Sequence, residues 1–308
     1  MNLKYLVLAL VLGTNNALAS FDVLKFSGAH RLLSQKRREV VSSVAKGVKY
    51  RLSKRSSVQT EQCVLQPKPP TFPGSDGPNG TVGGSNGLIN ATDSSCGASG
   101  ATLNITAKSG PNGNIDWINC GITDGGWKPP FVQISDIVTV ELSSVLEDST
   151  SPFQACSSYV SIFEKYGTQF DVPPILLASF AMQESTCNPK TVGEGGEQGI
   201  MQISQDKCAG APKGDCLDPD FNIMAGTEFF ADTLKGNNGD LFLTIGEYNG
   251  WSSGLTISQA TAAANSSCCR CQNNLDYIHQ FLNGWCQNID AYSHDPPLGK
   301  YFNLNDCN

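Results

Sequence analysis

Positive charge is scarce over most of this chain of 308 residues. Eleven of its 21 lysines and arginines fall within residues 1–55, which hold only two of the 28 acidic residues. Residues 56–308 therefore carry 10 basic against 26 acidic side chains, a formal charge of −16. Such a field repels nucleic acid and anionic membrane surfaces, so we expect no nucleic-acid partner.

Long apolar runs are also lacking. The longest candidate, from Tyr5 to Gly13, has about half of the roughly 20 residues that a membrane-spanning helix needs. Lys4 precedes this run and small residues follow it up to Ala19, an order typical of secretory signal peptides. We predict a signal peptide at residues 1–19, no membrane span, and a secreted, extracellular protein.

The segment after the signal peptide differs in composition from the rest. It ends in the dibasic pair Lys54-Arg55, and we interpret residues 20–55 as a basic pro-segment, although such blocks can also be nucleic-acid arms or solvated tails. The composition of residues 56–129 predicts an irregular Gly/Ser/Pro-rich arm or linker. Four Asn-x-Ser/Thr sites fit a glycoprotein, although this short pattern also arises by chance: Asn79, Asn90, Asn104 and Asn265.

Few residues could bind a metal ion. Residues 56–308 contain two histidines, His279 and His294, and no H-E-x-x-H motif, so we expect no metal site and no cofactor. All twelve cysteines follow position 62, and an even number in an exported chain predicts disulfides, including for the Cys268-Cys269-x-Cys271 cluster. Three cysteines precede residue 150 and nine follow it, so at least one bridge would join the two parts if all pair.

Residues 130–308 have helical rather than strand periodicity, and predict a mainly α, disulfide-stabilised domain large enough to bury a core. Aromatic and apolar side chains recur on one face from Tyr159 to Phe170. Asp171 before Pro173-Pro174 is a plausible start for an almost wholly apolar helix. We expect Asn188-Pro189 to end that helix. Further helices are predicted at 222–234, from Asp240 through Tyr248, and along Leu275, Ile278, Leu282 and Trp285. The arm before residue 130 could dock on this domain through Trp117, Ile118 and Trp127.

Glu184 lies at the end of the apolar helix, before a Gly-rich segment at residues 193–199. Desolvation by apolar neighbours and the negative end of the helix dipole both disfavour the ionised carboxylate and raise its pKa. A carboxyl that stays protonated near neutral pH can act as a general acid. Its position alone fits a carboxylate on a solvated helix end equally well.

The residues around Glu184 resemble two signatures of the lytic transglycosylases and goose-type lysozymes, glycoside hydrolase family 23. Gln183-Glu184-Ser185 is similar to the Glu-Ser signature, and Gly199-Ile200-Met201-Gln202, fifteen residues after Glu184, is similar to the Gly-Leu-Met-Gln signature. The likeness extends from about Tyr159 to Trp251. It includes the further landmarks Asn188-Pro189, Asp218-Pro219, Asn222-Ile223, Ala225-Gly226, Gly239-Asp240 and Tyr248-Asn249-Gly250.

The resemblance implies a lysozyme-like helical fold and cleavage of the β-1,4 bond between N-acetylmuramic acid and N-acetylglucosamine in peptidoglycan. Glu184 matches the general acid and base of that reaction. In the transglycosylases the sugar's own 6-hydroxyl then attacks, which gives an anhydro product without water. The resemblance also implies a set of substrate-binding residues: Ser185, Ile200, Met201, Gln202, Tyr248 and Asn249.

Two acidic residues depart from the transglycosylase pattern. Glu194 and Glu197 follow Glu184 by 10 and 13 residues, and an inverting hydrolase needs a second carboxylate about 6.5–9.5 Å from its acid. Goose-type lysozymes have an Asp in this loop, which Glu194 matches when counted back from Gly199. This slightly favours hydrolysis, while simple solvation of the Gly-rich loop by both side chains stays open.

Other functions are compatible with parts of the sequence. Chitin shares the N-acetylglucosamine unit and suits an acidic chain, and a secreted carbohydrate-binding protein could keep the cleft without turnover. The pattern from Gly250 to Gly254, with Asp276 and His279 after it, resembles an esterase nucleophile motif but lacks the strand-to-helix context that the motif needs. We predict a monomeric glycosidase that acts on peptidoglycan or another polysaccharide containing N-acetylglucosamine.

Overall fold

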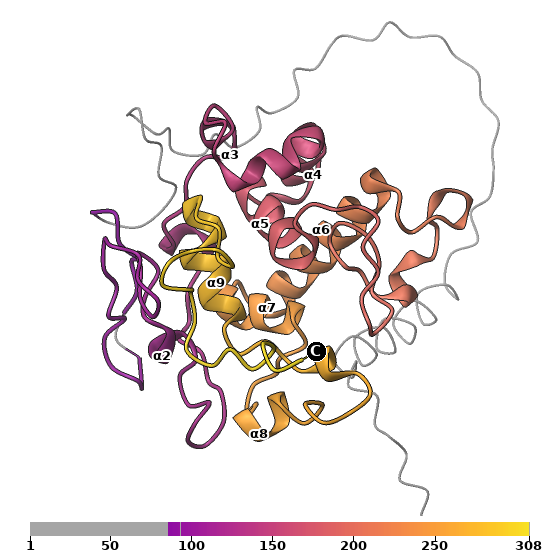
Figure 1. Cartoon of the computed structure of the whole chain (residues 1–308). Coiled ribbons are helices and arrows are strands. Elements are labelled where there is room, and N and C mark those ends of the chain that lie inside the picture. Colours follow the sequence, from indigo (N-terminus) through magenta and orange to yellow (C-terminus); the bar gives the residue numbers. More distant parts are fainter. Residues whose placement is uncertain (1–85, 93, 308) are drawn as a thin grey trace, which may run out of the picture.

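The computed structural model describes residues 86–92 and 94–307 of the chain (Figure 1). The predicted signal peptide and pro-segment, together with Cys63 and Asn79, lie outside the described residues. Asn90, Asn104 and Asn265 lie on the surface with exposed side chains.

The described residues form short helices joined by long loops. The α-helices are α2 (Ile115–Ile118), α3 (Leu142–Val145), α4 (Val160–Phe170), α5 (Pro174–Ser185), α6 (Pro219–Gly236), α7 (Leu241–Tyr248), α8 (Ile257–Ala260) and α9 (Tyr277–Asn283). The 3-10 helices are η1 (Ile134–Asp136), η2 (Pro152–Tyr159), η3 (Gln205–Cys208), η4 (Pro212–Gly214), η5 (Cys269–Cys271) and η6 (Trp285–Gln287). Extended backbone within these residues pairs only as isolated single-residue bridges, so the mainly α prediction is confirmed. No helix in this part of the chain is long and apolar enough to cross a membrane.

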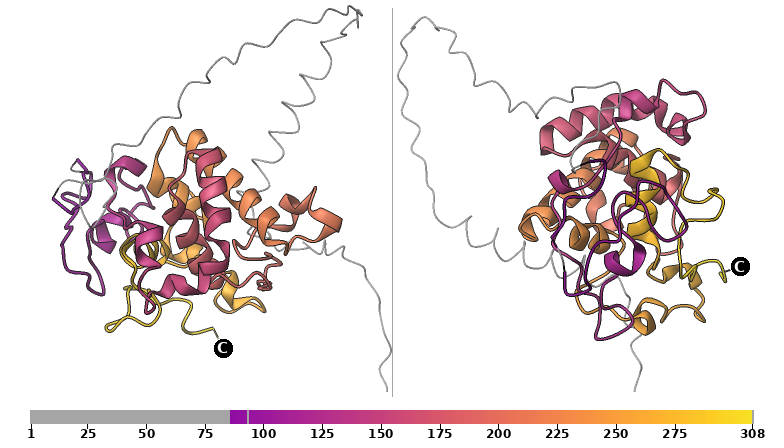
Figure 2. Two further views of the ribbon diagram at one scale, coloured as in Figure 1. Left: turned by 90° about the horizontal axis from the view of Figure 1, so that it is seen from above. Right: turned by 90° about the vertical axis from the view of Figure 1, so that its left-hand side faces the viewer.

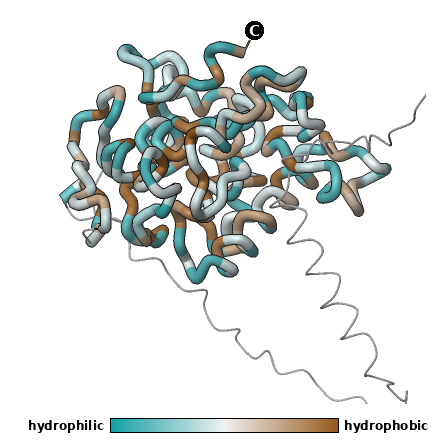
Figure 3. Tube along the Cα trace, turned by 90° about the horizontal axis from the view of Figure 1, so that it is seen from below, coloured by the Kyte–Doolittle hydropathy of each residue, from teal (hydrophilic) through white to brown (hydrophobic). Residues whose placement is uncertain are grey.

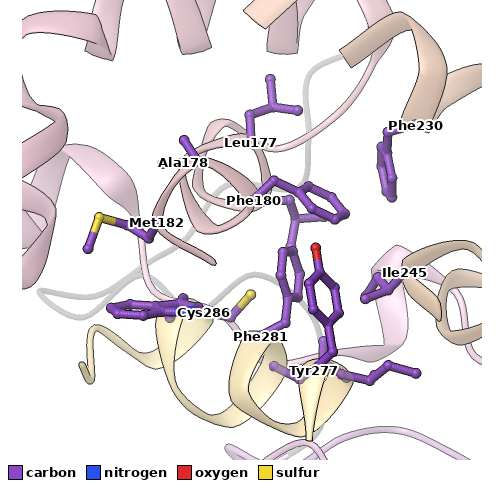
Figure 4. Packing of buried hydrophobic residues seen from close by; sticks show 14 of the residues in the cluster. Leu177, Ala178, Phe180, Met182, Phe230, Ile245, Tyr277, Phe281 and Cys286 are labelled. Atoms are coloured by element: carbon purple, nitrogen blue, oxygen red, sulfur yellow. The ribbon is translucent and has the colours of Figure 1, made fainter. Parts of the chain in front are cut away.

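Helix α5 is the centre of the core. Its residues from Ile175 to Gln183 are all buried, and it packs against α3, α4, α9, η2 and η6. Figure 4 shows Phe180 of α5 facing Phe281 of α9, and the ring centroids of this pair are 4.4 Å apart. Hydrophobic segments gather towards the middle of the Cα trace and hydrophilic loops lie at its edge (Figure 3). The all-round apolar sequence of this helix therefore reflects burial on every side.

Several helix boundaries differ from the prediction; α5, for example, already ends at Ser185, before Asn188-Pro189, with Thr186 as its left-handed C-cap. Asp171 does not start α5, because it ends α4 in the left-handed conformation with φ of 56°; Pro173 is the N-cap of α5 and Pro174 its first residue. Helix α6 begins at Pro219, three residues earlier than expected, because the Asp218 side chain caps it by accepting a hydrogen bond from the Phe221 N–H. The predicted cap of α7 by Asp240 is confirmed, since its side chain accepts from the Leu243 N–H.

The described part of the N-terminal arm is built into the core. Trp117, Ile118 and Trp127 are all at most 1% exposed and belong to the same hydrophobic cluster as α5, as predicted. Buried Asn112 ties the arm to the rest, because its side-chain amide donates to the carbonyls of Val138 and Leu282. Figure 2 shows the arm wrapped along the side of the molecule that carries α9.

Five disulfides connect loops that are rich in polar residues. The pairs are Cys96–Cys120, Cys156–Cys187, Cys208–Cys216, Cys268–Cys271 and Cys269–Cys307. The expectation that disulfides rather than a metal occupy the cysteine cluster at 268–271 is confirmed. None of the bridges among the described residues crosses position 150, and Cys286 is buried there with a free thiol.

Close packing of the arm against α7 leads to a first prediction. A Cβ added at Gly246 would lie 2.3 Å from the ring of Trp127, which itself stacks edge-on against Trp251. We expect Gly246→Ala to lower the free energy of unfolding by about 2 kcal/mol, the usual cost of overpacking a dense core. Urea unfolding of the oxidised protein measures this change.

Gly236 provides the matched control for that substitution. It is the last residue of α6 and has no atom within 4 Å of an added Cβ, so Gly236→Ala should be neutral or stabilising by up to about 1 kcal/mol. Equal effects of the two substitutions would contradict the packing described for Trp127.

Candidate active site

Glu184 is the second-last residue of α5 and lies in the wall of a pocket of about 840 Å³. The residue is half-buried, because it reaches solvent through the pocket while the core surrounds its other side. Burial is the main cause that raises the pKa of its carboxyl from 4.5 to about 7, and the negative charge of Glu197 adds to the rise. The direction of this pKa shift, and burial as its main cause, agree with the expectation from the sequence.

Tyr277, the first residue of α9, fixes the orientation of this carboxyl. Its hydroxyl donates a hydrogen bond to Oε1 of Glu184, which lowers the carboxyl pKa and opposes part of the effect of burial. Burial and the nearby carboxylate raise the pKa of Tyr277 well above 10, so the tyrosine stays a donor at all working pH values. Because Oε1 accepts this hydrogen, the acidic proton of Glu184 resides on Oε2.

Gln183 joins the end of α5 to the opposite wall of the pocket. Its side-chain oxygen accepts from the Trp285 indole N–H at 2.6 Å, and its amide donates to Gln280 at 3.2 Å. The Tyr292 hydroxyl donates to the backbone carbonyl of Gln183 at 2.7 Å. These contacts hold the backbone next to Glu184 on both sides.

Ser185 connects α5 to the second signature. Its hydroxyl donates to the Ile200 carbonyl at 2.7 Å and accepts from the Asn188 N–H at 3.1 Å. A hydroxyl carries one hydrogen, so the serine that lines the pocket already uses it inside the protein. In this structure Ser185 positions the loop at residues 199–202 relative to Glu184.

Asn222 of α6 makes hydrogen bonds that hold the loop of the second signature, residues 199–202, in place. The side chain of this fully buried residue accepts from the Met201 N–H at 2.8 Å and donates to the carbonyls of Gln198 and Cys216. Gly199 has φ of +79°, and an added Cβ would lie 2.2 Å from the Asn222 amide. The conformation of this loop therefore requires glycine at position 199 and the asparagine side chain at position 222.

The remaining predicted binding residues lie around this loop. Tyr248 donates from its hydroxyl to the Met201 carbonyl at 2.9 Å and stacks on Phe180. Gln202 donates from its amide to the carbonyls of Thr191 and Gly199. Ile200 and Met201 are fully buried. The pocket wall contains none of the four residues Ile200, Met201, Gln202 and Tyr248.

Asn249 does line the pocket beside Glu184. Its side-chain oxygen accepts from the Trp251 indole N–H at 3.2 Å and from the backbone N–H of Asn274 at 3.0 Å. Asn249 thus links the end of α7 to the chain that leads into α9. Of the six predicted binding residues, the structure places only Ser185 and Asn249 in the wall of the pocket.

The two acidic residues of the Gly-rich loop have different surroundings. Isolated bridges pair Val192 with Gln198 and Gln198 with Ile203, which leaves Glu194 exposed in the turn at the loop tip. Glu197 is half-buried on the returning side, folds over the backbone of the same loop, and acts electrostatically on Glu184. Of these two carboxylates, Glu197 is the one whose negative charge contributes to the raised pKa of Glu184.

The esterase-like pattern has no catalytic arrangement in the structure. Asp276 accepts three hydrogen bonds from the backbone N–H groups of residues 300–302. His279 is fully buried, bonds the Ala107 carbonyl at 2.9 Å, and has its pKa lowered to about 4 by burial. Both residues are engaged in holding the fold. Within the described ranges no group of three or more histidine, cysteine or acidic residues could hold a metal ion.

Comparison with known proteins places the site in a family context. Residues 161–264 match the transglycosylase SLT domain family. Membrane-bound lytic murein transglycosylase F of Serratia proteamaculans is 36% identical over 69 residues, which are 22% of this chain and 14% of that protein. The 70 kDa soluble lytic transglycosylase of Escherichia coli matches at 26% identity over 30% of this chain and 16% of its own, with a TM-score of 0.28.

The SLT match includes both signatures, which confirms the predicted resemblance to the lytic transglycosylases. The chain spans less than a fifth of the length of either relative. Five residues within the matched region line the pocket: Gln183, Glu184, Ser185, Thr186 and Asn249.

The rest of the pocket comes from residues that follow the SLT match. They are Arg270, Asn274, Asp276, Tyr277, Gln280, Tyr292, Phe302, Leu304 and Asn305. None of them was predicted from the sequence as a site residue, apart from Asp276 in the esterase-like pattern. Tyr277 lies between Leu275 and Ile278, which identified the last helix, but neither periodicity nor spacing indicated that it bonds Glu184.

Proposed function

We propose that this chain is a secreted, monomeric glycosidase that cleaves peptidoglycan at the β-1,4 bond between N-acetylmuramic acid and N-acetylglucosamine. The observation that carries the proposal is the carboxyl of Glu184, which has a pKa of about 7 and lies in a pocket with its Oε1 bonded by Tyr277. The SLT match around this residue supports the choice of substrate.

In the proposed reaction Oε2 of Glu184 protonates the glycosidic oxygen and the bond to the sugar breaks. The oxocarbenium-like centre that develops is stabilised by the substrate's own acetamido group and by dipoles of the pocket. Glu184, now ionised, then removes the proton of the sugar's 6-hydroxyl, whose oxygen attacks to form the anhydro ring. Tyr277 stabilises the carboxylate between the two steps, because its hydroxyl donates to Oε1 throughout.

Product analysis tests this proposal directly. Purified protein incubated with peptidoglycan should release fragments that end in an anhydro sugar, which mass spectrometry separates from reducing ends by the mass of one water. Chitin oligomers serve as the neutral second substrate. If neither polymer is cleaved, the proposal that the protein is an enzyme would be contradicted, and a carbohydrate-binding protein would be the alternative.

Hydrolysis is the second candidate, because the negative charge of Glu197 contributes to the raised pKa of Glu184. An inverting hydrolase would use this second carboxylate to activate water. Reducing ends in place of anhydro ends would support that reaction.

The variant Glu197→Gln separates the two reactions. If the 6-hydroxyl attacks, we expect the variant to keep its anhydro product. The basic limb of its pH profile should move to lower pH, since the charge that raises the Glu184 pKa is gone. A loss of turnover of about 10²-fold, as expected for removal of a general base, would instead favour hydrolysis. Glu194→Gln is the matched control and should change neither quantity, because Glu194 is exposed at the loop tip.

A further inference from the structure

Arg270 is an unusual charge for the wall of this pocket. It is the one arginine in residues 56–308, where acidic residues outnumber basic ones 26 to 10. Its side chain is exposed and lines the same pocket as Glu184. The ion pairs found in the described part of the chain involve three lysines and leave this guanidinium available to a ligand.

The backbone that carries Arg270 is fixed by covalent bonds on both sides. The arginine lies in η5 between Cys269 and Cys271. Cys269 is bonded to Cys307 near the C-terminus, and Cys271 closes a tight loop with Cys268. A site whose backbone is rigid before binding loses less entropy when a ligand orders it.

The segment bonded to this loop is itself held in place. Asp276 accepts from the backbone N–H groups of Lys300, Tyr301 and Phe302. The Asn303 side chain accepts from the Leu275 N–H at 3.0 Å and donates to the Asn273 carbonyl. This fixed segment of chain carries three residues that line the pocket together with Arg270: Phe302, Leu304 and Asn305.

From these observations we propose that Arg270 binds a carboxylate of the substrate and selects acid-bearing glycans over neutral ones. A guanidinium presents a planar set of donors that matches a carboxylate in two parallel hydrogen bonds. Residues 56–308 carry a net negative charge and repel anions, so a guanidinium in the pocket wall defines where an acidic group of the ligand is placed. This inference rests on the proposed function, because peptidoglycan carries carboxylates on its peptides, and on lactyl groups that bear no peptide, whereas chitin carries none.

A binding experiment tests the role of Arg270 separately from turnover. The probes are a disaccharide-peptide fragment of peptidoglycan and the same fragment with its carboxylates amidated. Calorimetric titrations use the full chain with Glu184→Gln, which prevents cleavage. In this background we expect Arg270→Gln to weaken binding of the acidic fragment about tenfold, the size of one hydrogen-bonded charge contact, and to change binding of the amidated fragment less than about twofold.

Two further variants sharpen the result. Arg270→Lys keeps the charge but not the planar donor set, so its affinity for the acidic fragment should fall between those of Arg and Gln. Lys128→Gln removes an exposed cation that does not line the pocket and should leave both affinities unchanged. The difference between the two fragments should also shrink at high salt, since an exposed charge contact is screened.

The outcomes are distinct from those that test the reaction. Three outcomes would overturn the inference. Arg270→Gln could weaken the binding of both fragments equally, it could weaken the binding of neither, or the Glu184→Gln protein that retains Arg270 could fail to bind the acidic fragment. Failure of the unsubstituted chain to cleave peptidoglycan would contradict the proposed function, and it would leave the comparison of the two fragments to be judged on its own readout.

Discussion

Replacement of Glu184 by Gln should lower kcat on peptidoglycan by about 10³-fold while the protein stays folded. The amide is nearly the same size as the acid and can still accept the hydrogen bond from Tyr277, but it cannot donate a proton to the leaving oxygen. Loss of a general acid costs typically 10²–10⁴-fold. Initial rates of soluble-fragment release, measured with circular dichroism as a check on folding, give the effect.

The matched control for this substitution is Glu228→Gln, which removes an exposed carboxylate from α6. Its rate should equal that of the unsubstituted protein within a factor of about two. A Glu184→Gln protein with more than a tenth of normal activity would show that another group supplies the proton, and would remove the basis of the proposed mechanism.

Loss of the Tyr277 hydroxyl should change both the rate and its pH dependence. In the unsubstituted protein the acid form of Glu184 predominates below a pKa of about 7, so kcat/KM should fall as pH rises through that value. Tyr277→Phe removes a hydrogen bond that stabilises the ionised form, which raises the pKa of Glu184. The basic limb of the profile should therefore move to higher pH.

The same variant should also lose about 10²-fold in kcat near pH 7, because a displacement of about 1 Å in a reacting group has that effect. Tyr292→Phe is the comparison, since its hydroxyl bonds the backbone carbonyl of Gln183 rather than the carboxyl of Glu184. Its basic limb should stay in place. A limb that moves to lower pH in Tyr277→Phe would contradict the hydrogen bond described here.

Much of the helical framework could be predicted because its signals are local. The run from Ile175 to Met182 is apolar on all sides, and Asp240 is a side-chain cap directly before α7. The raised pKa of Glu184 follows from the same run, since burial at the end of α5 is its main cause. The predicted starts of α5 and α6 were wrong by a few residues. Helix caps depend on side-chain and backbone geometry, which the spacing of residues along the chain does not contain.

The opposite wall of the pocket could not be predicted, because tertiary contacts create it. Tyr277 lies 93 residues from Glu184 in the chain, and Arg270 reaches the pocket through disulfides whose pairing cannot be deduced from cysteine positions. The different surroundings of Glu194 and Glu197 follow from the bridge between Val192 and Gln198, which spacing along the chain does not reveal. The assignments of Ser185 and Tyr248 as substrate ligands remain predictions, and their hydroxyls have partners inside the protein.

The position of the second pocket wall matters for anyone who expresses part of this protein. A recombinant fragment cut to the SLT match would end at residue 264. It would retain Glu184 but lose Tyr277, α9, and the C-terminal segment that is bonded to Cys269 through Cys307. Such a fragment would expose one side of α5 to water, and its inactivity would say nothing about the activity of the intact protein.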